Sequence, residues 1–290
     1  MSKNVLVTGG SGFIGSHVVD FLIEKKYNVT IYDLFLPKRR DVKFIKGSIL
    51  DKKRLQFALQ NIDFVFHLAA VSDINKVKNF PTKTIETNIL GTTYLLEASK
   101  YKNIKRFIFA GSVYSYGVAG NLYTTSKIAS ELIIKNYKLL FNQEFTILRY
   151  TTAYGPRSRE VDAISIFVER ALKNLDVVIF GDGQQKRNYL HVEDLAKGSM
   201  MAFKQKTKNK IITLASENNI KIFNLAKVII RLTNSRSKIR FNKKNKRFDD
   251  FTSNYSYNNT KRNLVNWKPK YNLNQGLAQY IEIKRKLLRI

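Results

Sequence analysis

The sequence predicts an α/β fold in which a doubly wound parallel sheet is joined to a smaller C-terminal lobe. Short apolar runs alternate with segments of helical periodicity through the first half of the chain. A glycine-rich turn separates the first apolar run from the first helical segment, and the alternation becomes irregular after residue 149. The 290 residues suffice for one large domain and a smaller attached one.

The expected elements follow in chain order. Six runs have the length of strands, at residues 4–8, 29–33, 43–46, 64–67, 106–110 and 145–149. The helical segments between them are long enough to connect parallel strands, near residues 13–26, 51–60, 84–101 and 123–141. We therefore assign residues 1–150 to the sheet domain, with a return segment at about 186–215. Residues 151–185 and 216–290 are assigned mainly to the smaller lobe.

Composition excludes several kinds of chemistry. The chain has no cysteine, which excludes disulfides, thiolate metal ligands and a cysteine nucleophile. Its three histidines, His17, His67 and His191, are far apart in sequence, so we expect structural roles for them and no metal site. No apolar run reaches the roughly 18 residues of a membrane span, and the first residues lack the pattern of a secretory signal. We expect a cytoplasmic protein.

The net charge of +29 raises the possibility of an anionic partner. Lysines are spread along the whole chain, and the densest basic runs lie at 204–210 and 235–247. This spread favours a solvated basic surface. Long-range steering of an anionic substrate and binding of an anionic polymer are the alternatives, and no nucleic-acid partner is expected.

The stretch VLVTGGSGFIGSH predicts a dinucleotide site in a Rossmann-type sheet. Gly10, Gly12 and Gly15 have the spacing G-x-G-x-x-G between a predicted strand and a predicted helix. Such a turn lets the backbone approach a pyrophosphate at the start of a helix. Asp33 ends the second predicted strand 18 residues after Gly15, where a carboxylate binds the ribose hydroxyls of NAD and repels the 2′-phosphate of NADP. The basic residues 38–40 follow closely, so NADP remains the alternative.

Several motifs along nearly the whole chain resemble one known family. They are TGGSGFIGS (8–16), HLAA (67–70), NILGT (88–92), YTTSK (123–127), LRYTTAYGPR (148–157), GDGQQKRNYLHVEDLA (181–196) and WKPKYNLNQGL (267–277). In this order the motifs resemble the extended short-chain dehydrogenase/reductase family, in its NAD-dependent nucleotide-sugar epimerase/dehydratase branch typified by UDP-glucose 4-epimerase. The resemblance implies a substrate-binding role for the smaller C-terminal lobe.

The resemblance implies three catalytic residues. Tyr123 matches the acid/base of the Y-x-x-x-K motif, and Lys127 lies four residues later, on the same face of a helix. A positive charge at about 4 Å in an effective dielectric near 20 offers roughly 4 kcal/mol, or about three pKa units, to a phenol whose free pKa is about 10. Ser112 matches the hydroxyl that binds the reacting sugar oxygen. Lys127 would also hold the nicotinamide ribose.

The resemblance also implies contacts to NAD from the glycine turn, from the ends of the following strands and from the catalytic helix. The candidate cofactor residues are Gly9, Gly10, Gly12, Phe13, Ile14, Gly15, Asp33, Ser48, Ile49, Leu68, Ala69, Ala70, Asn88, Tyr123, Lys127 and Tyr150. The family counterpart of Asn88 helps to order the cofactor and active-site surroundings.

On the substrate side, the resemblance implies a nucleotide diphosphate sugar. The candidate contacts are Ser112, Thr152, Arg187 and Arg247. Arginine suits a pyrophosphate because its guanidinium bonds in a bidentate way.

The chain departs from the family pattern at four points. Thr152 stands where the family has Asn, Ser48 where it often has Asp, and Asn188 where it has the Asp of R-D-[FY]. Ser112 and Tyr123 are eleven residues apart, closer than is typical, which predicts a more open pocket.

We expect an NAD-dependent nucleotide-sugar 4-epimerase that acts through a transient 4-keto sugar. A nucleotide-sugar 4-dehydrogenase or 4-keto reductase on the same scaffold is the alternative, followed by a non-catalytic polyanion-binding relative. Dehydratase or decarboxylase activity is disfavoured, because Val113, Tyr114 and Ser115 follow Ser112 where those relatives carry an acidic residue. The segments near 84–101 and 123–141 resemble the family's four-helix dimer interface, which implies a homodimer.

Overall fold

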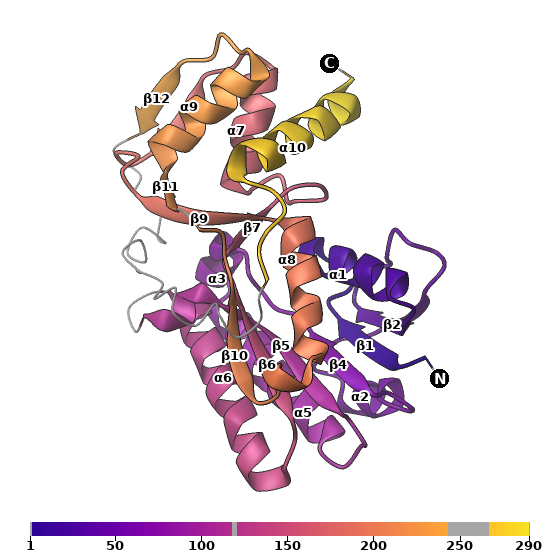
Figure 1. The fold of residues 1–290 in the computed structure, drawn as a ribbon. Coiled ribbons are helices and arrows are strands. Elements are labelled where there is room, and N and C mark those ends of the chain that lie inside the picture. Colours follow the sequence, from indigo (N-terminus) through magenta and orange to yellow (C-terminus); the bar gives the residue numbers. More distant parts are fainter. Residues whose placement is uncertain (1, 118–120, 218, 243–266, 290) are drawn as a thin grey trace. The chain divides into compact units, whose positions relative to one another are not determined.

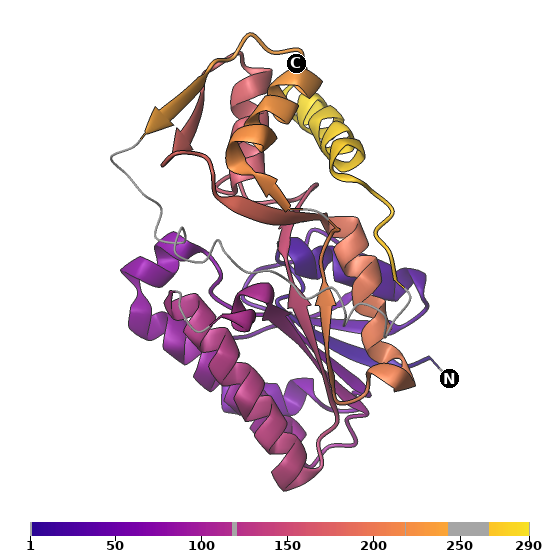
Figure 2. The same ribbon diagram turned by 60° about the vertical axis from the view of Figure 1, so that its left-hand side comes forward.

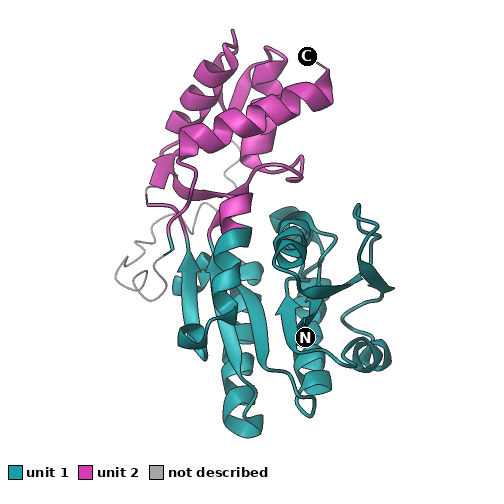
Figure 3. Cartoon of the chain, turned by 45° about the vertical axis from the view of Figure 1, so that its right-hand side comes forward, with its two compact units in different colours: residues 1–150, 196–214, 257–267 teal, residues 151–195, 215–256, 268–290 magenta. Residues whose placement is uncertain are grey.

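The computed structural model describes residues 2–117, 121–217, 219–242 and 267–289. These residues belong to two compact units (Figure 3). Unit 1 takes those within 1–150, 196–214 and 257–267, and unit 2 takes those within 151–195, 215–256 and 268–290.

Unit 1 contains a seven-stranded parallel sheet of order β10-β6-β5-β4-β1-β2-β3. Its strands are β1 (Asn4–Thr8), β2 (Asn28–Asp33), β3 (Lys43–Lys46), β4 (Phe64–His67), β5 (Arg106–Ser112), β6 (Phe145–Tyr150) and β10 (Lys210–Leu214). The strand order reverses between β1 and β4, where ligands of open α/β sheets bind. The predicted doubly wound α/β fold is confirmed.

Helices cover both faces of this sheet (Figures 1 and 2). One core packs the strands against α2 (Lys52–Ala58), α5 (Gly91–Ser99) and α6 (Leu122–Phe141). On the opposite face lies α1 (Phe13–Glu24), and Phe203 of the short 3₁₀-helix η3 (Met200–Phe203) packs on Phe64 and Phe66 of β4. Among the residues described, no helix is long and apolar enough to cross a membrane.

The connection between β4 and β5 differs from the single helix expected near 84–101. It contains α3 (Ile74–Asn79), α4 (Pro81–Ile85), a π-helical turn η1 (Glu86–Leu90) and then α5. A π turn inserts one extra residue into a helix and often lies at a functional site. Here the turn contains the buried Asn88.

The described part of unit 2 contains two small sheets, three whole helices and the first turn of α8 (Val192–Ser199). The strands are β7 (Thr152–Tyr154), β8 (Val177–Phe180), β9 (Lys186–His191), β11 (Asn219–Lys221) and β12 (Ile239–Asn242), paired in the orders β11-β9-β7 and β12-β8. The helices α7 (Ala163–Leu172), α9 (Ile222–Thr233) and α10 (Leu273–Leu288) share one apolar core. Residues 186–195, which we had placed in the return segment, belong to unit 2 because β9 pairs with β7 and β11.

A buried carboxylate anchors the segment that leads into α10. Asp194, in the first turn of α8 (Val192–Ser199), is 2% exposed. Its Oδ1 accepts a hydrogen bond from the backbone N–H of Lys270 and its Oδ2 accepts one from Tyr271, both at 2.8 Å. The carboxylate thereby satisfies two backbone donors inside unit 2.

Asp194→Asn should destabilise the protein, because the amide nitrogen that replaces one oxygen cannot accept a hydrogen bond. We expect the free energy of unfolding, measured by urea denaturation, to fall by about 2 kcal/mol, within the range for hydrogen bonds to charged groups. The control is Glu24→Gln at the exposed end of α1, which should change it by less than about 0.5 kcal/mol. Equal stability of the two variants would contradict this role of Asp194.

Candidate active site

The glycine turn after β1 requires two of its glycines. Gly9 has φ of +73°, and a Cβ there would lie 2.6 Å from the backbone nitrogen of Ala69. A Cβ on Gly15 would lie 2.0 Å from the carbonyl oxygen of Gly9. The turn therefore folds on itself and against residues 68–69, so the predicted cofactor residues of β1 and β4 meet at the strand-order reversal.

The first turn of α1 is open to an anion. Gly12 stands at its N-cap, and no side chain among the described residues caps it. The first helical hydrogen bond runs from the N–H of Ser16 to the carbonyl of Gly12, so the N–H groups at Phe13 and Ile14 belong to the unpaired first turn of a helix. Gly10 packs on Ile31 of β2, below this turn. Such a helix start suits a pyrophosphate.

Asp33 lies beside the same turn. Its Oδ2 accepts a hydrogen bond of 3.0 Å from the N–H of Ser11, and its Oδ1 accepts one of 3.1 Å from Phe35. Each carboxylate oxygen retains a lone pair for a ribose hydroxyl. The open helix start, the lack of a Cβ at Gly9, Gly10 and Gly12 and this carboxylate together fit NAD.

Two predicted residues follow β3. The Ser48 hydroxyl accepts a hydrogen bond from the N–H of Leu50 at 3.2 Å, and its carbonyl accepts one from the Tyr32 hydroxyl at 2.8 Å. Ile49 is 5% exposed and packs into the core of unit 1. Its side chain is therefore structural, and only its backbone remains for a cofactor contact.

Asn88 uses its whole side-chain amide within the protein. Its Oδ1 accepts from the N–H of Val71 at 2.7 Å, while its Nδ2 donates to the Val71 carbonyl at 2.9 Å and to the Ser126 hydroxyl at 3.0 Å. The π turn thereby ties the segment of Leu68, Ala69 and Ala70 to α6. Asn88 positions this region from a buried site.

The ammonium of Lys127 is buried at the centre of the site. Its Nζ donates to the Ala110 carbonyl at 2.7 Å and lies 4.7 Å from the centre of the Phe109 ring and 5.7 Å from that of Tyr123. Burial lowers the pKa of Lys127 to about 8, against a smaller opposing effect of Glu131. The predicted placement of Tyr123 and Lys127 on one helix is confirmed.

Ser112 ends β5, two residues after the carbonyl that binds Lys127. It is 5% exposed, and its hydroxyl accepts a hydrogen bond from the N–H of Tyr114 at 3.2 Å. Tyr123 follows the N-cap Asn121, whose side chain accepts from the N–H of Thr124. Part of the connection between them, residues 118–120, lies outside the described residues, so the more open pocket stays a prediction.

A charged cluster beside Lys127 was missed by the sequence analysis. Glu131 lies one helical turn after Lys127 and forms a buried ion pair with Arg149 at 2.6 Å. The Arg149 guanidinium stacks on the Tyr116 ring at 4.3 Å, and the Tyr116 hydroxyl is hydrogen-bonded to Thr213. The cluster holds the turn η2 (Val113–Tyr116), which directly follows Ser112. Only the i, i+4 spacing of Lys127 and Glu131 signals it in the sequence.

The three histidines are buried among structural contacts. His67 is hydrogen-bonded through Nδ1 to Thr8 at 2.7 Å and through Nε2 to Thr92 at 2.9 Å. Burial and the charge of Lys127 lower the pKa of His67 to about 3, which keeps its ring neutral. His17 packs against Phe13, and His191 packs between aromatic rings of unit 2. These contacts agree with the expected structural roles.

Tyr150, a predicted cofactor residue, has its phenol directed into the protein. The side chain is 6% exposed at the end of β6, and its hydroxyl is hydrogen-bonded to that of Ser199 at 2.8 Å. Burial raises the pKa of this phenol. Tyr150 therefore fixes the end of the strand through its side chain.

The remaining substrate candidates that the structure describes, Thr152 and Arg187, belong to unit 2. Thr152 of β7 pairs with Tyr189 of β9, and Arg187 lies two residues earlier on β9. Both candidates are partly exposed. Arg247 lies outside the described residues.

Asn188, which replaces an expected aspartate, has a clear structural role. Its Oδ1 accepts from the backbone N–H of Ser216 at 2.9 Å, and its Nδ2 donates to the Ser216 carbonyl at 3.1 Å. An aspartate could make only the first of these bonds. The amide therefore suits this position in unit 2.

The chain is similar to known proteins over most of its length. The chain is 32% identical to a putative UDP-glucose 4-epimerase of Methanocaldococcus jannaschii, over 96% of this chain and 97% of that protein. It is 33% identical to a UDP-N-acetyl-α-D-glucosaminuronate decarboxylase of Bacillus cytotoxicus, over 82% and 83% of the two chains. Its fold matches the crystal structure of UDP-glucose 4-epimerase from Thermotoga maritima with UDP-glucose, at a TM-score of 0.89, 31% identity and coverage of 98% and 99%.

A protein-family model matches more than half of the chain. Residues 5–215 match the NAD-dependent epimerase/dehydratase family, and this range includes the glycine turn, Ser112, Tyr123 and Lys127. The recognised resemblance and the expected cofactor are both confirmed. The protein therefore belongs to the NAD-dependent epimerase/dehydratase family of enzymes.

Proposed function

We propose that the protein is a nucleotide-sugar 4-epimerase that acts through a transient 4-keto sugar. The observation that carries the proposal is the buried ammonium of Lys127 beside the ring of Tyr123, on the helix that follows Ser112. A cation there stabilises the phenolate and lets Tyr123 act as a base near neutral pH. Similarity to 4-epimerases over nearly the whole chain supports this reading.

In the proposed reaction, the Tyr123 phenolate oxygen removes the proton of the sugar 4-hydroxyl and later returns it. The Ser112 hydroxyl hydrogen-bonds the same sugar oxygen and holds it in line with the phenol. Lys127 keeps its charge beneath the phenol and binds the nicotinamide ribose. When bound, NAD would accept the C4 hydride and return it to the opposite face of the sugar, which would give the epimer.

The substrate is proposed to be a nucleotide diphosphate sugar. Residues 1–150 with the returning residues 196–214 would bind NAD, and the smaller lobe would bind the nucleotide. Arg187 offers a cation for the pyrophosphate, and Thr152 offers a hydroxyl in place of the family's amide. The net charge of +29 would favour the approach of such an anion.

A nucleotide-sugar 4-dehydrogenase or 4-keto reductase remains the second candidate, because the same residues serve one-way oxidation or reduction. Dehydration and decarboxylation receive less support. The four residues after Ser112, Val113–Tyr116, form η2 and carry no carboxylate that could move a second proton. A polyanion-binding role receives the least support, since Ser112, Tyr123 and Lys127 are all present.

A homodimer is also proposed. α6 exposes Leu132, Leu139 and Leu140, with exposed fractions of 53%, 82% and 71%. Large apolar side chains that share one helix often mark an interface. Sedimentation of the purified protein distinguishes a dimer from a monomer. A cytoplasmic location stays a prediction.

A panel of nucleotide sugars tests the reaction class. Enzyme and NAD would be incubated with UDP-, GDP-, dTDP- and CDP-sugars, and the products would be separated by chromatography and weighed by mass spectrometry. Epimerisation gives a product of unchanged mass without accumulation of NADH. A product lighter by two hydrogens, with stoichiometric NADH, would establish the dehydrogenase instead. Loss of one water would contradict the argument from η2.

Tyr123→Phe should retain the fold and the cofactor but lose at least about 10²-fold in kcat, within the range expected for general acid/base catalysis. The measurement is steady-state turnover on the best substrate of the panel, with NAD affinity as the control. Near-normal turnover would remove Tyr123 from the mechanism.

Lys127→Met should raise stability near pH 7, because the buried ammonium opposes folding. Its pKa is about 8 in the fold and about 10.4 when unfolded, so the unfolded chain binds more protons between these values and stability rises with pH in that window. We expect the advantage of Lys127→Met over wild type to shrink by about 1 kcal/mol between pH 7.5 and 9, measured by urea denaturation. The matched control is Lys53→Met at an exposed position of α2. A constant difference for both variants would show that Lys127 keeps its ordinary pKa.

A further inference from the structure

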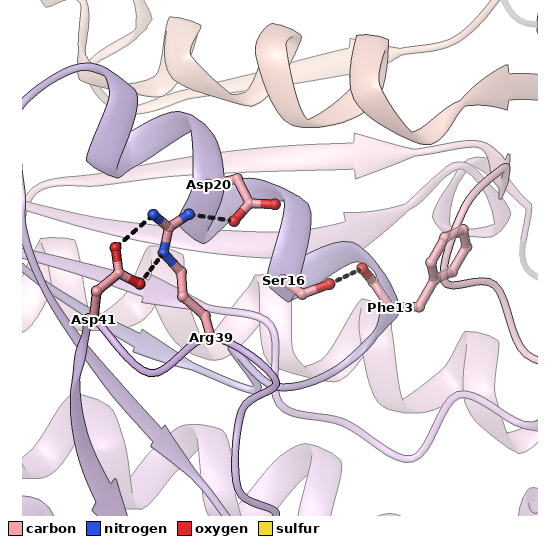
Figure 4. Close-up of polar contacts among 5 residues, drawn as sticks. All are labelled: Phe13, Ser16, Asp20, Arg39 and Asp41. Carbon is pink, nitrogen blue, oxygen red and sulfur yellow. Dashed lines mark hydrogen bonds and ion pairs between the residues drawn. The ribbon is translucent and has the colours of Figure 1, made fainter. Parts of the chain in front are cut away.

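An arginine that follows the cofactor carboxylate is held by two aspartates. Arg39 donates through Nε and NH2 to the two carboxylate oxygens of Asp41, at 2.6 and 2.7 Å, and through NH1 to Asp20 at 2.8 Å (Figure 4). All three guanidinium nitrogens are thus engaged. We call Arg39, Asp20 and Asp41 the arginine clamp.

The clamp fixes where the guanidinium lies. Asp20 is on α1, one helical turn beyond Ser16 and seven residues after Phe13. At 1.5 Å per residue this is about 10 Å along the helix from the open N-terminal turn. Asp33, by contrast, is bonded to Ser11 within the glycine turn itself. The guanidinium is therefore held beside the middle of α1, away from the helix start.

The position of Arg39 in the chain makes this placement important. The loop that carries Arg39 leaves the end of β2, where Asp33 is placed to bind the ribose hydroxyls of NAD. NADP carries a 2′-phosphate at the same ribose, and an arginine bonds a phosphate in a bidentate way. A free arginine six residues after Asp33 would offset the repulsion between that carboxylate and the phosphate.

We propose that the arginine clamp is a specificity device, in which Asp20 and Asp41 withhold Arg39 from a 2′-phosphate and so strengthen the preference for NAD. The inference rests on the cofactor alone and stands apart from the sugar reaction. Both aspartates are needed: Asp41 occupies the bidentate edge of the guanidinium, and Asp20 anchors it to α1.

The expected size of the effect is modest. The Arg39 side chain is 34% exposed, and those of Asp20 and Asp41 are 36% and 63% exposed. Single ion pairs at such exposure are weak, but a bidentate pair within a three-membered network holds one geometry. We therefore expect release of Arg39 to change NADP affinity by about tenfold.

The test measures the Kd of NAD and of NADP by titration calorimetry, without any sugar. Asp20→Asn/Asp41→Asn removes both charges at nearly constant side-chain volume and should bind NADP about tenfold more tightly, with NAD within twofold. Adding Arg39→Gln to this double variant should abolish the gain. Arg39→Gln alone should leave the NADP affinity of the wild-type background unchanged, because the clamped arginine does not reach the phosphate.

Three results would overturn the proposal. The first is that the double variant binds NADP no better than wild type. The second is that its gain in NADP affinity persists when Arg39→Gln is added. The third is that Arg39→Gln alone lowers the NADP affinity of the wild-type protein. A gain that persists would mean that the loss of negative charge, and no contact from Arg39, favours the phosphate. Thermal unfolding confirms that each variant is folded. If the double variant does not fold, the single variant Asp41→Asn tests the proposal. It frees the bidentate edge of Arg39 and should raise NADP affinity about threefold. An unchanged NADP affinity would reject the proposed role of the clamp.

Discussion

Burial of the positive charge of Lys127 is the constraint on which the rest of the site depends. The fold meets it with one carbonyl, that of Ala110, with the face of the Phe109 ring and with the field of Glu131 one turn along α6. β5 supplies the first two groups and then ends at Ser112. The position of the Ser112 hydroxyl, which we propose to be catalytic, and the solvation of the lysine are therefore set by the same strand.

The buried charge of Lys127 is destabilising for the fold, and the same charge would stabilise a phenolate at Tyr123. The Nζ of Lys127 lies 5.7 Å from the centre of the Tyr123 ring. A unit charge at about 6 Å, with an effective dielectric near 20, stabilises a phenolate by about 3 kcal/mol, or about two pKa units. Two ionisable side chains next to Lys127, those of His67 and Glu131, do not neutralise that charge. His67 stays neutral between two threonines and so adds no repelling charge, and Glu131 directs its carboxylate to Arg149. In the proposed mechanism, the charge of Lys127 acts on Tyr123 because Glu131 is paired with Arg149 and His67 is neutral.

The first six strands and the glycine turn could be predicted because the residues that specify each of them are contiguous in the sequence. The features that the sequence did not predict depend on contacts between residues that lie far apart in the chain. β10 borders a basic run, and it becomes a strand by pairing with β6. The hydrogen bond of Tyr116 spans 97 residues. Arg39 is one of the basic residues that left NADP as the alternative, and the sequence does not reveal its ion pair with Asp20, 19 residues earlier. Asn88 was assigned to the cofactor, whereas its amide binds protein groups that only the fold brings near.

The pKa of the Tyr123 phenol tests the central claim most directly. Protein labelled with ¹³C at the Cζ atoms of tyrosine would be titrated by NMR in the presence of NAD, with Tyr123→Phe to assign the signal. The account predicts a pKa well below the ordinary value of about 10, and a rise of about two units in Lys127→Met. A pKa near 10 in both proteins would contradict it, because the buried charge would then leave the phenol unchanged.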